Sequence, residues 1–235
     1  MIKYLISLLI GILAGFGLLF TGLYYNPLNS YDDLSPLSVT DNELISLNYS
    51  AVAKDSLVYT NDGESQVEPH PAKVLQLWEA PIRRTTAMAT VLRDSRGQLA
   101  GIGIKFSSDS ERSNVLDGKA LKDSVWHIYL PERGSLFVEQ TENYWAYIRE
   151  IVLPARWSSS DSWRGTWRDN ITAGPGALGT ARVIGGSGQL NGLNSEAVEA
   201  LTAKAYSVAQ GPVAIQGELS IEIPKNEAAQ TLATE

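Results

Sequence analysis

The stretch Val213-Ala-Ile-Gln-Gly-Glu-Leu-Ser-Ile-Glu-Ile223 alternates apolar and polar residues close to the end of the 235-residue chain. Because successive side chains of a strand point to opposite faces, this period of two predicts a strand with one buried face. The expected inward face comprises Val213, Ile215, Leu219, Ile221 and Ile223, and the outward face Gln216, Glu218, Ser220 and Glu222. Such a strand is stable only as part of a larger sheet.

Segments with similar alternation recur upstream, separated by turn residues. Thr85–Leu92 and Leu99–Phe106 flank a turn and predict one hairpin; Ser124–Leu130 and Ser135–Thr141 predict a second. The other expected strands are Leu44–Tyr49, Ser56–Thr60 (before an Asp62-Gly63 turn), Tyr144–Leu153 (stopped by Pro154) and Gly179–Ile184. Ser195–Tyr206 fits either a short helix or the last strand but one. The chain is therefore expected to be mainly β, as an antiparallel eight-stranded barrel or, alternatively, a β-sandwich.

The N-terminal segment is strongly apolar, with no charged residue between Lys3 and Asp32. As a helix, residues 4–25 are about long enough to cross a hydrocarbon core of roughly 30 Å. A cleaved signal peptide, the alternative, would have a shorter apolar region and a small-x-small cleavage site. The sequence therefore favours an uncleaved single transmembrane helix.

Charge sets the expected topology and the division of the chain. Lys3 precedes the span, whereas Asp32, Asp33, Asp41 and Glu43 follow it, which favours a cytoplasmic N-terminus. We expect a single-pass inner-membrane protein whose domain is periplasmic or extracellular. The expected parts are an anchor (1–28), a tether (29–43), a barrel domain (44–224) and a disordered tail (225–235).

Small residues form one stripe of the membrane helix, at Ser7, Gly11 and Gly15. This spacing lets two helices approach closely and would support a homodimer. Stripes of this kind also occur in unpaired membrane helices.

Composition disfavours several classes of function. The net charge of −7 disfavours nucleic-acid binding, which needs a basic face. The chain has no cysteine, and His70 and His127 have no partner at metal-ligand spacing, so neither a metal nor another cofactor is expected. Gly185–Gly188 lacks the Lys-Ser/Thr of a phosphate-binding loop, and a Gly-x-Ser-x-Gly elbow is missing. The sequence identifies no catalytic residue.

The stretch Gly179-Thr-Ala-Arg-Val-Ile-Gly-Gly-Ser-Gly-Gln-Leu-Asn-Gly-Leu193 resembles the strand–GGTG–turn signature of the allene oxide cyclase and dirigent barrels. The resemblance implies an eight-stranded antiparallel barrel with a central cavity, in which Gly185, Gly186 and Gly188 shape a tight turn at the rim. Two features depart from that pattern. Glu196-Ala-Val-Glu replaces a glycine-rich return strand, and the membrane anchor has no counterpart in the plant enzymes. The resemblance carries over no catalytic residue.

Tryptophan and arginine are interleaved between positions 145 and 168. Together they can bind a ligand that is partly apolar and partly anionic, through stacking and bidentate hydrogen bonds. A structural alternative is that Trp plugs a barrel end while Arg surrounds it. The candidate ligand-binding residues are Trp145, Tyr147, Arg149, Trp163, Arg164, Trp167 and Arg168, with His127 and Tyr129 from a neighbouring strand.

These observations favour a non-enzymatic function. The expected protein is a membrane-anchored extracytoplasmic barrel that binds an apolar or anionic small molecule, such as a lipid-like ligand, or an envelope protein. The resemblance implies an alternative, a cyclase- or isomerase-like enzyme acting on an apolar substrate. In that case Glu139, Arg149 and Tyr129 would be the cavity groups that steer the reaction.

Overall fold

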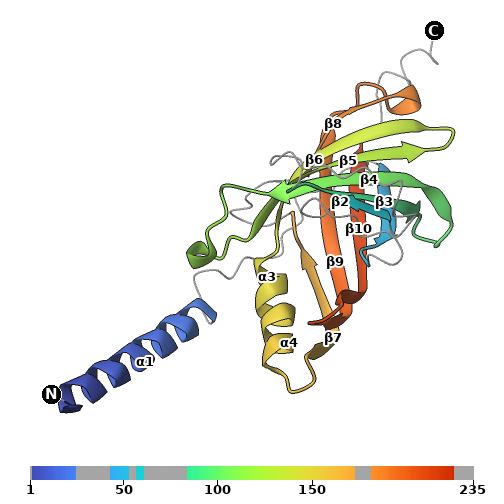
Figure 1. Cartoon of the computed structure of the whole chain (residues 1–235). Coiled ribbons are helices and arrows are strands. Elements are labelled where there is room, and N and C mark those ends of the chain that lie inside the picture. Colours follow the sequence, from blue (N-terminus) through green and yellow to red (C-terminus); the bar gives the residue numbers. More distant parts are fainter. Residues whose placement is uncertain (1, 25–42, 53–56, 61–83, 173–180, 225–235) are drawn as a thin grey trace, which may run out of the picture.

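The computed structural model describes residues 2–24, 43–52, 57–60, 84–172 and 181–224 (Figure 1). The Asp62-Gly63 turn, His70, nearly all of the expected tether and the expected tail lie outside these residues. Helix α1 (Ile2–Tyr24) contains a segment, Lys3–Gly22, that is long and apolar enough to cross a membrane, and none of it is buried. A signal sequence would share these properties.

The described residues form ten strands, eight of which close into an antiparallel barrel. Neighbouring strands follow the order β1-β10-β9-β8-β6-β5-β4-β3, and the pair Asn48–Arg93 joins β3 back to β1. β2 (Leu57–Thr60) also pairs with β3, and β7 (Ser162–Asn170) pairs with β9. This topology confirms the barrel and excludes the sandwich. The eight barrel strands are β1 (Glu43–Ser50), β3 (Thr86–Arg93), β4 (Leu99–Asp109), β5 (Leu121–Leu130), β6 (Gly134–Asn143), β8 (Ala181–Gly186), β9 (Ser195–Ser207) and β10 (Gly211–Ile223).

The glycine cluster at the end of β8 terminates that strand, as expected from the sequence. A Cβ on Gly186 would lie 2.3 Å from the Leu190 carbonyl oxygen, and Gly188 has φ of +64°, a conformation that favours glycine. The chain then enters a short 3₁₀ helix, η6 (Gly188–Leu190), which places Leu190 in the barrel core. A second 3₁₀ helix, η4 (Val115–Asp117), lies between β4 and β5.

The segment predicted as a strand at Tyr144–Leu153 is helical, so that prediction was wrong. It forms α3 (Trp145–Tyr147), the π-helix η5 (Ile148–Val152) and α4 (Leu153–Trp157). The Asn143 side chain accepts the backbone N–H of Trp145 at 3.0 Å and starts the helix. Pro154 lies in the first turn of α4, where a missing N–H is tolerated, and so does not stop the segment.

The predicted inward face of β10 is correct except at its first residue. Ile215, Leu219 and Ile221 are buried and Ile223 packs against the core, but Val213 is 44% exposed. The pairing with β9 shifts register around Ala214, and such a bulge reverses the alternation on its far side. The ambiguous segment Ser195–Tyr206 is the strand β9.

Truncating Ile221 to alanine is expected to lower the free energy of unfolding by about 2–5 kcal/mol, because the side chain is fully buried. Glu218→Ala is the comparison on the other face. Its carboxylate accepts hydrogen bonds from Ser46 and Arg168 near solvent, contacts that are worth about 1 kcal/mol or less. Urea denaturation of both variants checks this, and a larger loss for Glu218→Ala would contradict the inward register.

Candidate functional site

The barrel interior is apolar at one end. Fourteen buried side chains there form one cluster, which Leu190 of η6 closes. They include Trp126, Ile128, Leu136, Val138, Leu219 and Ile221. This end of the barrel is therefore filled by its own side chains.

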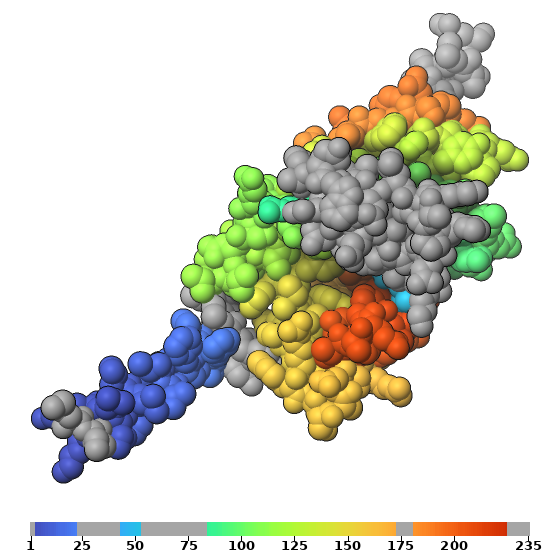
Figure 2. Space-filling view, in the orientation of Figure 1, coloured from blue at the N-terminus to red at the C-terminus, as the bar shows by residue number. Residues whose placement is uncertain are grey.

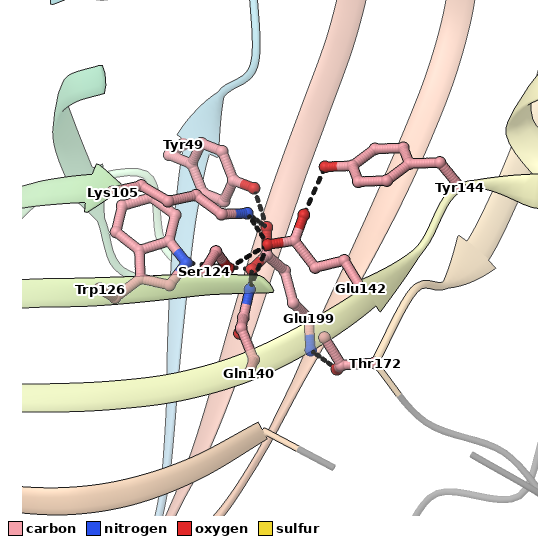
Figure 3. Close-up of polar contacts among 9 residues, drawn as sticks. All are labelled: Tyr49, Lys105, Ser124, Trp126, Gln140, Glu142, Tyr144, Thr172 and Glu199. Carbon is pink, nitrogen blue, oxygen red and sulfur yellow. Dashed lines mark hydrogen bonds and ion pairs between the residues drawn. The ribbon is translucent and has the colours of Figure 1, made fainter. Parts of the chain in front are cut away.

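Toward that opposite end, the carboxylate of Glu199 projects from β9 and is completely buried (Figure 3). One oxygen accepts hydrogen bonds from the Tyr49 hydroxyl and from Lys105 Nζ, the latter at 2.7 Å. The other oxygen accepts from Trp126 Nε1 at 3.0 Å and from the Gln140 amide. Four donors therefore satisfy this carboxylate.

A second buried carboxylate, Glu142 of β6, lies on the other side of Lys105. Its Oε1 is 2.9 Å from Lys105 Nζ and accepts from Gln140 at 2.9 Å and from the Ser124 hydroxyl. Its Oε2 accepts the Tyr144 hydroxyl at 2.6 Å. Lys105 thus bridges two carboxylates, and the three groups together carry a formal charge of −1.

The pKa values of these groups follow from burial and from their partners. Burial alone would lower the pKa of Lys105, but Glu142 and Glu199 outweigh it and raise the pKa above its ordinary value. Burial alone would raise the pKa of Glu142, but Lys105 and the hydrogen bonds lower it. Burial and the neighbouring carboxylates raise the pKa values of Tyr49 and Tyr144 well above the usual range. At neutral pH Lys105 is therefore an ammonium, Glu142 is a carboxylate, and Tyr49 and Tyr144 are neutral phenols.

Alkaline pH is expected to destabilise the barrel through these tyrosines. Because their folded pKa values exceed the ordinary value of 10.0, their stabilisation is complete below pH 10 and is lost as pH rises further. Each contributes a slope of about 1.4 kcal/mol per pH unit. Urea denaturation between pH 9 and 12 should show a shallower slope for Tyr144→Phe, and equal slopes in the two proteins would contradict the assignment.

A pocket of about 190 Å³ opens beside this network, at the mouth of the barrel. An engineered apolar cavity of about 150 Å³ can hold benzene, so the pocket suits a group with one ring or a short chain. Its lining joins strand ends that meet at this mouth: Tyr49, Ala51, Thr86, Met88, Lys105, Ser107, Lys122, Tyr144, Tyr147, Leu201, Pro212 and Ile215. The α3–α4 segment and the β9–β10 connection lie side by side at this end (Figure 2).

Tyr147 of α3 is the unusual residue of the pocket. Its ring packs edge-on against Tyr144, Trp167 and Tyr206, with centroids 5.7–6.2 Å away. Its hydroxyl oxygen is buried, yet has no hydrogen-bond partner among the described residues. Burial and then Tyr206 raise its pKa, so the hydroxyl keeps its proton. A buried hydroxyl without a hydrogen-bond partner is costly, and such groups are rare in folded proteins.

Two larger hollows lie elsewhere and are less suited to a ligand. One of about 470 Å³ follows β4–β6, and there Arg112 already pairs with Asp123 at 2.7 Å. The other, of about 590 Å³, lies at the β1–β3 seam, where Asp94 accepts the backbone N–H groups of its own turn. In the part of the chain that the structure describes, no cluster of three or more His, Asp or Glu could hold a metal.

Of the nine residues proposed from the sequence, only Tyr147 lines the mouth pocket. Trp163 and Trp167 pack into a second apolar cluster with Ile151, Ile171, Leu201, Ala203 and Ile215. Arg149 pairs with Glu150 and Arg168 with Glu218, while Arg164 is exposed and Trp145 is partly buried. Their role in binding remains a prediction.

The strand residues proposed from the sequence lie on the outside of the barrel. His127 is exposed and stacks on Phe137, with ring centroids 4.6 Å apart, and Tyr129 is also exposed. Glu139 is on the outer face too and lines the hollow along β4–β6. Glu139 and Tyr129 therefore do not face the barrel interior, where the enzyme alternative needs them. The alternation that buries Trp126 and Ile128 directs their neighbours outward.

Sequence reasoning missed Lys105, Glu142 and Glu199. Each lies at an inward position of its strand, in line with buried apolar or small residues such as Gly103, Val138 and Ala197. A charged residue on an inward face was therefore the available signal.

Comparison with known proteins adds little to this description. No family model matches the chain, and no curated protein matches it either. Among solved structures it is similar to a pterocarpan synthase dirigent protein, at 10% identity and a TM-score of 0.35, over 81% of this chain and 91% of that one. At this level of likeness no residue role or activity passes to this chain, and the barrel assignment rests on its own strand pairing.

Proposed function

We propose that this protein is a membrane-anchored binding protein whose barrel mouth takes up a small, largely apolar molecule. The observation that carries the proposal is the mouth pocket, whose lining combines apolar residues with Tyr147. The buried hydroxyl of Tyr147 has no hydrogen-bond partner among the described residues. Met88, Leu201 and Ile215 provide apolar surface, and a few polar groups fix orientation, as in most small-molecule sites.

The chemistry of the buried network favours binding over catalysis. A general base needs an oxygen or nitrogen that can take a proton from the substrate. Glu142 and Glu199 already accept four hydrogen bonds each, and neither lines the pocket. Lys105 lines the pocket, but its raised pKa keeps it as an ammonium and therefore not a nucleophile. The network instead forms a rigid polar layer beneath the mouth pocket.

The apolar helix α1 adds a location to this function. As an uncleaved span with a cytoplasmic N-terminus, it would keep the barrel at the outer side of an inner membrane, in the periplasm or outside the cell. A small apolar molecule partitions into that membrane and would be concentrated beside the barrel. Gly11 and Gly15 have open space around them, which leaves the small-residue stripe available for a second helix.

Two neighbouring serines of β4 provide the test. Ser107→Phe places a ring in the mouth pocket, whereas Ser108→Phe, the matched control, lies outside that pocket's lining. The full-length protein would be purified from membranes and extracted, and bound small molecules would be counted by mass spectrometry. We expect a stoichiometric ligand in the wild type and in Ser108→Phe and its loss in Ser107→Phe. Equal amounts in the two variants, or no ligand in any of them, would overturn the proposal.

A further inference from the structure

Two residues that line the pocket, Tyr147 and Lys105, have hydrogen-bond donors that no described acceptor uses. Tyr147 offers an O–H without a partner among the described residues. An ammonium has three N–H groups, and Lys105 uses one for Glu142 and one for Glu199, which leaves a third. Lys105 lines the pocket, and its Nζ also lies 5.2 Å from the centroid of the Trp126 ring. The neighbouring Tyr144 hydroxyl is already donated to Glu142. A ligand with an acceptor oxygen would pair with these unused donors, which the hydroxyls of Thr86 and Ser107 do not do in the structure.

The sign of the charge beneath the pocket argues against an anionic acceptor. The buried network contains two carboxylates, Glu142 and Glu199, and one ammonium, Lys105, so it has a formal charge of −1. This charge disfavours the binding of an anion nearby. The other lysine of the lining, Lys122, is 43% exposed, 3.9 Å from Asp109, and lies over the Tyr144 ring. Its charge is therefore exposed to solvent and partly balanced by Asp109.

We infer that the pocket selects a neutral molecule with a carbonyl-type acceptor oxygen, and that the Tyr147 hydroxyl is the group that selects it. This inference rests on the proposed function and specifies its ligand. The three aromatic rings around Tyr147 hold its ring in place, so the hydroxyl is oriented before the ligand arrives. An acceptor there relieves an unsatisfied donor, whereas an apolar group leaves it unpaired.

Three probes of similar size test the inference: acetophenone, which is neutral and has a carbonyl; benzoate, which is anionic; and ethylbenzene, which has no acceptor. Their affinities for the full-length protein in detergent would be measured by calorimetry at pH 7. One neutral hydrogen bond corresponds to roughly a tenfold difference in affinity, so acetophenone should bind about ten times more tightly than ethylbenzene and more tightly than benzoate.

The variant Tyr147→Phe should lose about tenfold for acetophenone and change little for ethylbenzene. Its melting temperature should not fall, because the deleted hydroxyl has no partner among the described residues. Tyr206→Phe is the control, since its ring packs against Tyr147 without lining the pocket. A purely structural role of Tyr147 would instead lower stability and affect all probes alike, which would overturn the inference.

The remaining outcomes separate this inference from the proposed function. Tightest binding of benzoate, abolished by Ser107→Phe, would overturn the neutral ligand while supporting a binding site in the mouth. Binding of acetophenone that Tyr147→Phe leaves unchanged would overturn the role of Tyr147. Binding of no probe, or binding that Ser107→Phe does not affect, would overturn both.

Discussion

Replacing Lys105 by methionine is expected to lower the free energy of unfolding by about 3–5 kcal/mol. Among the described residues, Lys105 supplies the only positive charge of the buried network, and its removal leaves Glu142 and Glu199 facing one another without that cation. Urea denaturation of the full-length protein at pH 7 measures the loss. Lys122→Met is the matched control at the rim, where the exposed lysine is expected to contribute less than about 1 kcal/mol.

A triple variant distinguishes charge from packing. Lys105→Met combined with Glu142→Gln and Glu199→Gln removes all three charges and keeps the side-chain shapes. Because neutral isosteric replacement of a buried ion network is often tolerated, most of the lost stability should return. A Lys105→Met protein as stable as Lys122→Met would contradict the network described here.

Gly217→Ala is expected to be the most disruptive single-methyl addition to β10, at about 3 kcal/mol. A Cβ at this position would lie 2.0 Å from Cζ of Tyr49, whose ring is buried and whose hydroxyl is held by Glu199. The ring has no simple way to withdraw. The melting temperature of the full-length protein measures the effect.

Gly185→Ala is the control for that substitution, because a Cβ there meets nothing within 4 Å. Its effect should stay within about 0.5 kcal/mol. The double variant Tyr49→Leu/Gly217→Ala removes the colliding ring and should cost less than the sum of its single changes. A full sum would show that the two sites are independent and that the collision does not occur.

Most of the barrel could be predicted from the sequence because a half-buried strand leaves a period of two. That period is clear in β4, β5, β6 and β10, where one face is consistently buried. It misled at Tyr144–Leu153, whose aromatic and β-branched residues resemble a strand. The spacing of four between Tyr147, Ile151 and Ala155, which pack on one side of the segment, was the helical signal. β7 was missed because its exposed arginines, glycine and threonine obscure any alternation.

The site was harder to predict because distant strands build it. Lys105 and Glu199 lie 94 positions apart, and only the pairing of several strands brings them together. The inward position of each charge could be read from local alternation, but the partner of each charge could not. Tyr147 was proposed from its aromatic neighbours. That its hydroxyl lacks a partner among the described residues depends on packing that the sequence does not show.

β1 meets its main partner, β10, across almost the whole barrel sequence, since Ser46 and Glu218 are 172 positions apart. Its ladder contact with β3 is the single Asn48–Arg93 pair. Folding slows as native contacts become more distant along the chain, and β10 leaves the ribosome after the other nine described strands. The barrel can therefore close only after β10 has been synthesised. A chain truncated before β10 would be an open sheet with the unpaired edge of β9 available to other chains, and not a smaller barrel.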